Sequence, residues 1–193
     1  MQTLTIQYLQ IFIDICKKIN SSLEIGAVLS SITESTASAL HVKGCAIFLL
    51  DRKSKRLRIG SSYGLSDAYI NKGAVDSEKS IVDTLNGEWV MVHDAKNDQR
   101  VQYRDEAGQE GIESILSLPM SVKGTIIGVL RIYTSQPRHF SEIENEFISG
   151  LAQIGSIGIE NARIHDHLKA EHEKLIYDVH QWFDFGASAG AHA

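Results

Sequence analysis

Two long apolar segments joined by a tight turn constrain the fold of this chain more than any other feature. They span residues 114–122 (SILSLPMSV) and 125–134 (TIIGVLRIYT), and each has the length and composition of a β-strand. Lys123 and Gly124 between them suit a tight turn, because glycine adopts the backbone angles that such a turn requires. The pattern predicts an antiparallel hairpin, and Arg131 is a positively charged residue in the middle of its second, otherwise apolar strand.

The N-terminal part of the chain predicts two helices and another hairpin. Apolar residues cover most of the surface of a helix over 3–19, so this helix must bury more than one face, and a copy of itself is the simplest second partner. A capping box of Ser21 and Glu24 precedes a second helix over 23–40. The strands of the additional hairpin are predicted over 44–50 and 57–63.

The middle of the chain is polar and predicts only short elements. Asp76 or Ser77 is expected to cap a helix that runs through Leu85, and a brief strand follows over 89–92. Residues 93–111 are crowded with Asp, Gln and Arg and show little apolar periodicity. We therefore expect loop and short helix here, on the surface of the sheet.

A second capping box, Ser141 with Glu144, predicts the start of a long closing helix. Its apolar residues recur regularly as far as Ile164, and an apolar seam continues beyond, broken by Glu171 and Asp178. This spacing predicts a short parallel or splayed helix contact in a dimer rather than a sustained coiled coil.

The composition excludes several classes of function. Of the 193 residues, 19 are basic and 24 acidic, and a net charge of -5 gives no attraction to nucleic acid or to an anionic membrane. The first twenty residues lack a basic leader and a cleavage site and carry Asp14, so we expect a cytoplasmic location. Cys16 and Cys45 have no metal-ligand spacing, and no metal or cofactor is expected.

Together these elements predict an α+β fold. We expect an antiparallel sheet of about five strands, with room for a sixth, whose terminal helices pack on one face while the polar middle segment crosses the other. The expected division of the chain is a dimerisation helix over 1–20, one domain over 21–165, a helical extension over 166–185 and a disordered tail over 186–193.

With these elements in place, the chain resembles a GAF domain over roughly residues 22–165. The shared pattern is a strand with Ser and Pro, a Gly turn, an Ile-Gly-Val-Leu strand, a Phe before a capped helix and a Glu-Asn-Ala-Arg sequence. Here these features are residues 114–119, Gly124, residues 127–130, Phe140 and residues 160–163. The sequences GCAIFLLD at 44–51 and SYGL at 62–65 also match the first hairpin of that family.

The resemblance implies a dimerising sensory module that binds a small molecule and is usually joined to a separate output domain. Cyclic-nucleotide-binding members carry Asn-Lys where this chain has Thr134 and Ser135, and this departure argues against a cyclic nucleotide as the ligand. Bilin-binding photoreceptors usually attach the chromophore through a Cys near the pocket, and free-methionine sulfoxide reductases use a pocket Cys with resolving partners. Cys16 and Cys45 lie instead on a terminal helix and at a strand start, so neither covalent bilin nor thiol chemistry is expected.

Strand alternation places Ile127, Val129, Arg131 and Tyr133 on one face of the sheet. In the fold that the resemblance implies, the ligand lies on this face. A buried guanidinium keeps its charge and requires an anionic partner, which is either an internal carboxylate or a carboxylate or phosphate of the ligand. The nearby carboxylates are Asp94, Asp98, Glu110 and Glu113.

The same geometry supplies a set of candidate ligand-binding residues around Arg131. They are Phe48, Tyr63, His93, Asp94 and Ser117. Tyr63 matches a position where family members often stack an aromatic ring on the ligand.

Three functions follow as hypotheses. The first is a homodimeric, non-catalytic GAF module that binds a small ligand, with anions among the candidates. This module would signal through its terminal helices to a separate signalling protein. The alternative is a dimerisation or docking module whose pocket is filled by its own side chains. A remote alternative is an enzyme like the free-methionine sulfoxide reductases, which would depend on Cys45.

Overall fold

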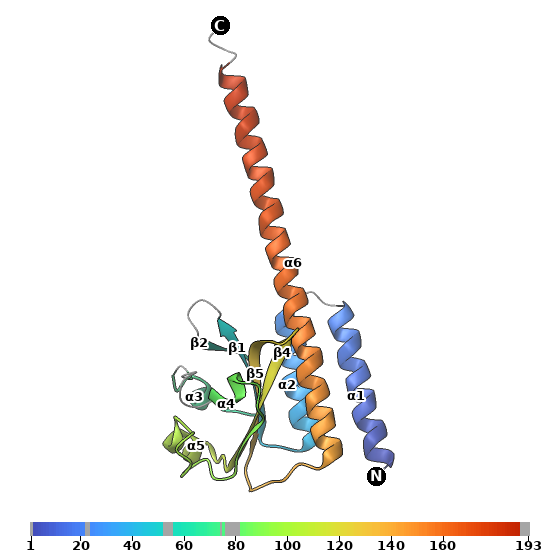
Figure 1. Ribbon diagram of the computed structural model, residues 1–193, viewed down its shortest axis with the longest axis vertical. Coiled ribbons are helices and arrows are strands. Elements are labelled where there is room, and N and C mark those ends of the chain that lie inside the picture. The colour runs from blue at the N-terminus through green and yellow to red at the C-terminus, as the bar shows by residue number, and fades with distance from the viewer. Residues whose placement is uncertain (1, 22–23, 52–55, 74, 76–81, 190–193) are drawn as a thin grey trace.

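The protein has one antiparallel sheet with helices on both faces (Figure 1). The structure is a computed structural model that describes residues 2–21, 24–51, 56–73, 75 and 82–189. Within these residues the sheet has five strands in the order β2-β1-β5-β4-β3, all antiparallel to their neighbours. The strands are β1 (Gly44–Asp51), β2 (Arg56–Tyr63), β3 (Val90–Val92), β4 (Ser114–Val122) and β5 (Thr125–Thr134). The predicted α+β fold is confirmed.

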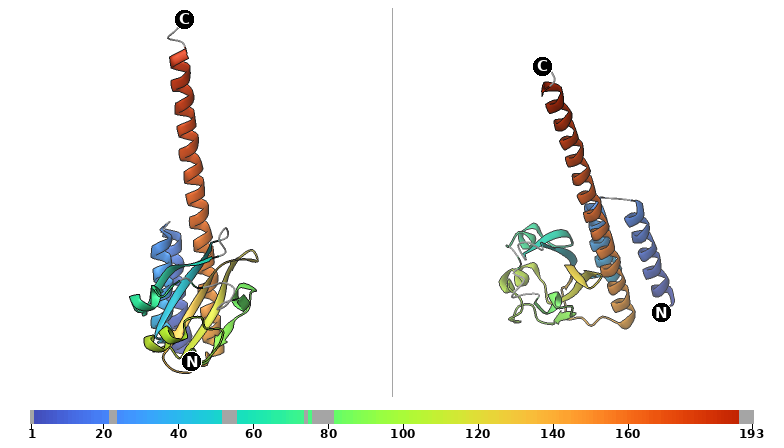
Figure 2. Two further views of the ribbon diagram at one scale, coloured as in Figure 1. Left: turned by 90° about the vertical axis from the view of Figure 1, so that its left-hand side faces the viewer. Right: turned by 45° about the horizontal axis from the view of Figure 1, so that its top comes forward.

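The helices divide between the two faces of the sheet (Figures 1 and 2). On the helix side lie α1 (Gln2–Ser21), α2 (Ile25–Leu40) and α6 (Glu142–Ala189), of which α6 projects far beyond the sheet. The opposite face, which we call the Arg131 side, carries the short helices α3 (Asp67–Ile70), α4 (Val82–Leu85) and α5 (Arg104–Glu110). None of the described helices is both long and apolar enough to cross a membrane.

The helix-side core joins α2 and α6 to the middle of the sheet. Leu118, Leu130 and Ile132 of the sheet are each at most 1% exposed, as are Ile148 and Leu151 of α6. Complete burial of an aliphatic side chain of this size contributes about 1.5–3 kcal/mol to stability. This apolar layer is therefore the main stabilising contact between the sheet and the long helix.

The Arg131 side has a second apolar core. Phe48 of β1 and Val129 and Tyr133 of β5 are buried there, and Tyr69 of α3 and Ala107 of α5 are buried with them. The middle segment of the chain thus covers this face, as the sequence predicts.

Helix α1 packs along α6 with one face and leaves another exposed. Tyr8 stacks on Phe147 with ring centres 4.3 Å apart, and Ile15 is fully buried. On the outward face, Ile6 and Leu9 are 67% and 58% exposed. One face of the helix therefore packs on its own domain as expected, and the second partner stays a prediction.

The two predicted capping boxes differ in outcome. At the start of α6 the Glu144 backbone N–H donates to Ser141 Oγ at 3.3 Å, and the Ser141 N–H donates to the Glu144 carboxylate at 2.8 Å, which confirms the box. The box of Ser21 and Glu24 is wrong. Ser21 still belongs to α1, and α2 begins at Ile25 after Glu24, which makes no side-chain capping bond.

A β-bulge in the first hairpin changes which side chains share a face. Ile47 pairs with Ser61 whereas Phe48 pairs with Ile59, so Gly60 is an extra residue in β2. An extra residue reverses the alternation of the side chains that follow it. The face predicted for Tyr63, at the end of β2, is therefore wrong.

A similar irregularity occurs near the turn between β4 and β5. Met120 pairs with Gly128 and Ser121 pairs with Ile126, which leaves Ile127 as the extra residue. Ile127 was predicted to share a face with Arg131, but it is buried in the helix-side core.

Helix α6 continues past its predicted end. The sequence predicts a disordered tail from residue 186, whereas α6 continues to Ala189. Alanine has the highest helix propensity, and Ala187 and Ala189 favour the continuation. Residues 190–193 and the expected cap at Asp76 or Ser77 lie outside the described residues.

Candidate ligand-binding site

Arg131 lies in the middle of β5 with its charged group almost fully buried. Its relative exposure is 5%, and its Nε–H donates to the Ser117 hydroxyl of β4 at 3.1 Å. Ser117 is the register partner of Arg131 in the adjacent strand, so this hydrogen bond follows from the pairing of β4 and β5. The guanidinium carbon is 5.9 Å from the ring centre of Tyr133. The predicted burial of Arg131 is confirmed.

A second cation, Lys72, lies on the same side of the sheet. Its ammonium group is 3.6 Å from the ring centre of Tyr69 and donates to the Tyr69 carbonyl oxygen at 2.7 Å. The Tyr69 ring meets the Tyr133 ring edge to face, with centres 5.8 Å apart. Lys72 and Arg131 therefore flank one pair of tyrosines, and we call these four residues together with Ser117 the cationic cluster.

Local sequence places Lys72 at this position. Ser66 caps α3 by accepting a hydrogen bond from the Tyr69 N–H at 3.2 Å, and α3 ends at Ile70. Lys72 follows two residues later, and its side chain turns back over the Tyr69 ring. A short capped helix thus brings a lysine from the loop onto the sheet.

The charges of the cluster affect one another. The pKa of Lys72 is lowered to about 8, first by burial and second by the nearby charge of Arg131. Burial also raises the pKa of the Tyr133 hydroxyl, although Arg131 opposes this effect. At neutral pH the cluster therefore holds two like charges and two neutral tyrosines, and the charges of Glu106 and Glu110 partly oppose the effect of Arg131 on Lys72.

The four carboxylates that the sequence offers as partners for Arg131 all contact other groups. Their contacts are Asp94 with Asn97, Asp98 with Arg100, Glu113 with Lys96, and Glu110 with Lys43 and Ser66. The ion pair of Glu110 with Lys43 has an N–O distance of 3.4 Å. These carboxylates thus serve mainly to hold the middle segment and its loops in place.

The predicted site residues separate into two groups. Phe48 and Ser117 are buried on the Arg131 side, as predicted. His93 and Asp94 are exposed on the loop after β3 and lie outside the cationic cluster.

The sequence places Tyr63 on the wrong face, since Tyr63 pairs with Cys45 of the helix-side core and is 43% exposed. The bulge at Gly60 is the cause.

Sequence reasoning missed Tyr69 and Lys72. The signal that could have found them is the Ser66-Asp67 pair, a favourable start for a short helix, which points to an ordered turn rather than an open loop. Nothing in the sequence shows that the lysine beyond this turn folds back over the sheet.

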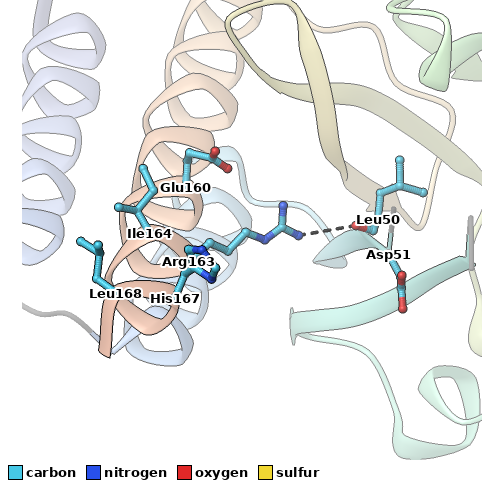
Figure 3. A pocket seen from close by; sticks show the side chains of 7 residues that line it. All are labelled: Leu50, Asp51, Glu160, Arg163, Ile164, His167 and Leu168. Atoms are coloured by element: carbon cyan, nitrogen blue, oxygen red, sulfur yellow. Dashed lines mark hydrogen bonds between the residues drawn. The ribbon is translucent and has the colours of Figure 1, made fainter. Parts of the chain in front are cut away.

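A separate cavity of about 520 Å³ lies where α6 leaves the sheet (Figure 3). Arg163 points from α6 toward the end of β1 and donates to the Leu50 carbonyl oxygen at 3.5 Å. The lining residues are Leu50, Asp51, Glu160, Arg163, Ile164, His167 and Leu168. None of the predicted ligand-binding residues lines this cavity.

Comparison with known proteins identifies the family. The profile of the GAF domain matches residues 22–160, nearly three quarters of the chain. The chain belongs to the GAF domain family. A curated relative, the methyl sulfide methyltransferase-associated sensor of Methanosarcina acetivorans, is 31% identical over 138 residues. The match covers 68% of this GAF protein and 14% of the length of that sensor.

Solved structures agree with the GAF fold. The GAF domain of a phosphoenolpyruvate-protein phosphotransferase from Coxiella burnetii has a TM-score of 0.74 at 22% identity, covering 84% of this chain and 98% of that one. The free methionine-R-sulfoxide reductase of Neisseria meningitidis, solved with its substrate, has a TM-score of 0.68 at 18% identity, covering 83% and 93%. At these identities the similarity shows the fold alone.

Proposed function

We propose that this GAF protein is a sensory module that binds a small oxyanion at the cationic cluster and acts as a homodimer. The observation that carries the proposal is the pair of cations, Arg131 and Lys72, on the two rings of one tyrosine pair. The membership of the GAF family and the sensor-named relative support the sensory part.

The chemistry of the cluster favours a carboxylate or a phosphate. A buried guanidinium stays charged, and its planar N–H groups match two oxygens of one anion. Lys72 adds a point charge, and the tyrosine hydroxyls can donate further hydrogen bonds. An anion between these groups would offset the repulsion between the two cations, so its binding is stronger than at either cation alone.

The second core on the Arg131 side supports the competing function. Phe48 and Tyr133 fill part of this face, which is what a docking module without a ligand would need. The two functions differ in one property, because only the sensory module gains stability from a small anion.

The ligand experiment is a thermal-unfolding titration of the full chain with inorganic phosphate and with succinate. A ligand at ten times its Kd is expected to raise Tm by about 3–6 °C. Arg131→Gln should abolish the shift, while Arg58→Gln, a change at an arginine whose side chain is 78% exposed, should leave it intact. Equal shifts in both variants, or none for a wide panel of carboxylates and phosphates, would support the docking module instead.

The dimer part of the proposal comes from apolar side chains that α1 and α6 leave exposed. On α6, Ile157, Ile164, Leu168 and Leu175 are 48–63% exposed and follow one another at intervals of seven, four and seven residues. This is the spacing of a parallel two-helix seam, for which a second copy is the simplest partner. Leu9 of α1 adds an exposed apolar residue beside the first turns of α6.

Sedimentation measurements test the dimer. Leu168→Asn should raise the dimer dissociation constant at least tenfold, since it places an amide in the apolar seam. The matched control is Ile59→Asn, an exposed apolar residue on β2, which should leave the dissociation constant unchanged. A monomer at all concentrations of the unmodified chain would remove the dimer from the proposal.

The proposal includes a cytoplasmic location and a separate signalling protein as the receiver of the signal. It does not include thiol catalysis. Cys45 is fully buried in the helix-side core, on the opposite face from the cationic cluster, and burial raises the pKa of its thiol. A thiol in this state is a poor nucleophile, so the sulfoxide reductase stays a remote alternative.

A further inference from the structure

A cavity of about 220 Å³ opens at the edge of the sheet, on the face opposite the cationic cluster. Met91 of β3 and Leu116 of β4 are register partners that line it and belong to the helix-side apolar layer. The full lining is Trp89, Met91, Leu116, Arg138, His139, Phe140 and Asn145. The sheet itself separates this cavity from Arg131, so it is a different site from that of the proposed function.

Three of the seven residues that line this cavity carry aromatic rings. Trp89 is 43% exposed, and Phe140 and His139 contribute two more rings. Flat walls of this kind favour a flat ring through stacking. The volume corresponds to about seven water molecules, below the usual range for drug-sized ligands, so one bicyclic ring system fits and a larger cofactor does not.

The polar groups of the cavity indicate a ligand without net charge. Arg138 donates to the Leu40 carbonyl oxygen and to the Glu144 carboxylate, and its guanidinium lies 4.9 Å from the ring centre of Phe140. Its charge is therefore already balanced within the protein. The Asn145 side-chain amide has two N–H donors and one oxygen acceptor. This amide and the imidazole of His139 suit a ring that carries nitrogen atoms.

From this geometry we propose that the cavity is a second ligand site, for a neutral bicyclic heteroaromatic compound. Its position gives the occupant a route to α6. Arg138 connects the end of α2 to the first turn of α6, where Glu144 also forms the capping box with Ser141. A compound against Arg138 and Asn145 thus contacts the junction at which the long helix begins.

The experiment is a ¹H–¹⁵N titration of the full chain with adenine, indole and quinoline as probes. The chain has two tryptophans, and Trp182→Phe leaves the indole N–H of Trp89 as the only such signal. For a probe of about ten non-hydrogen atoms we expect saturable shifts with a Kd on the order of 0.1–1 mM. The shifts should include the Trp89 indole and the Asn145 side-chain amide.

Variants decide whether the shifts come from this cavity. His139→Ala and Asn145→Ala should each weaken binding of the probe about tenfold, whereas His165→Ala, at an exposed imidazole on the distant part of α6, should leave the Kd within twofold. Arg131→Gln should also leave it unchanged, which separates this result from that of the proposed function. The proposal is overturned if no probe gives saturable shifts, or if the two cavity variants bind as the unmodified chain does.

Discussion

The two faces of the sheet use the same five strands for different purposes. The helix side is apolar at Leu130 and Ile132, with long helices packed directly on it. The Arg131 side alternates with it from Val129 to Tyr133 of β5, yet it buries a charge, a serine and a pair of tyrosines under short helices and loops. One strand therefore supplies apolar packing on one face and a buried positive charge on the other.

Leu130→Ala is expected to have the largest effect on stability. Leu130 is 0% exposed in the helix-side core, and truncation leaves a cavity that costs about 2–5 kcal/mol of the free energy of unfolding. Urea denaturation measures the loss. The anion-induced Tm shift should persist in this variant, and its disappearance would mean that the two faces are not separable.

Ser117→Ala tests the other face with a smaller expected cost. It removes the hydroxyl that accepts from Arg131 Nε, and a buried hydrogen bond to a charged group is worth about 1.5–3 kcal/mol. Because the guanidinium then loses a fixed position, the Kd for phosphate or succinate should rise several-fold in a calorimetric titration. A stability loss without any change in Kd would place Ser117 in the structure only.

Lys72→Met tests the burial of the Lys72 charge, and its contact with Arg131, through the pH dependence of stability. The pKa of Lys72 falls from 10.5 to about 8 on folding, so its charged form destabilises the folded state below pH 8. The unfolded chain holds this proton until about pH 10.5, so the stability contribution of Lys72 rises between these two values. Relative to the Met variant, the unmodified chain should therefore gain stability from pH 8 to 10, measured by Tm. A constant difference would contradict the lowered pKa of Lys72, and with it the burial of its charge beside Arg131.

Tyr63→Ala should have the smallest effect on binding. The bulge at Gly60 turns Tyr63 to the face of Cys45, away from the cationic cluster. Its truncation is therefore expected to leave the Kd for the anion within twofold, by the same calorimetric titration. A tenfold loss would show that the alternation predicted from the sequence, and not the bulged register, describes the site.

The sequence predicted the strands of the sheet and the polar middle segment over it, because the patterns that indicate them involve residues close together in the chain. The strands of the second hairpin and the capping box of Ser141 follow from apolar runs and short-range hydrogen bonds. Extra residues at Gly60 and Ile127 could not be predicted, since a bulge depends on pairing with another strand. The position of Lys72 depends on a fold-back over Tyr69, which periodicity does not encode.

A native mass spectrum of the purified full chain beside Arg131→Gln tests anion binding and dimer formation together. We expect a dimer of the unmodified chain that carries one small anion per subunit, lost on denaturation and missing from the variant. The same bare protein mass for both, after addition of phosphate and succinate, would contradict it.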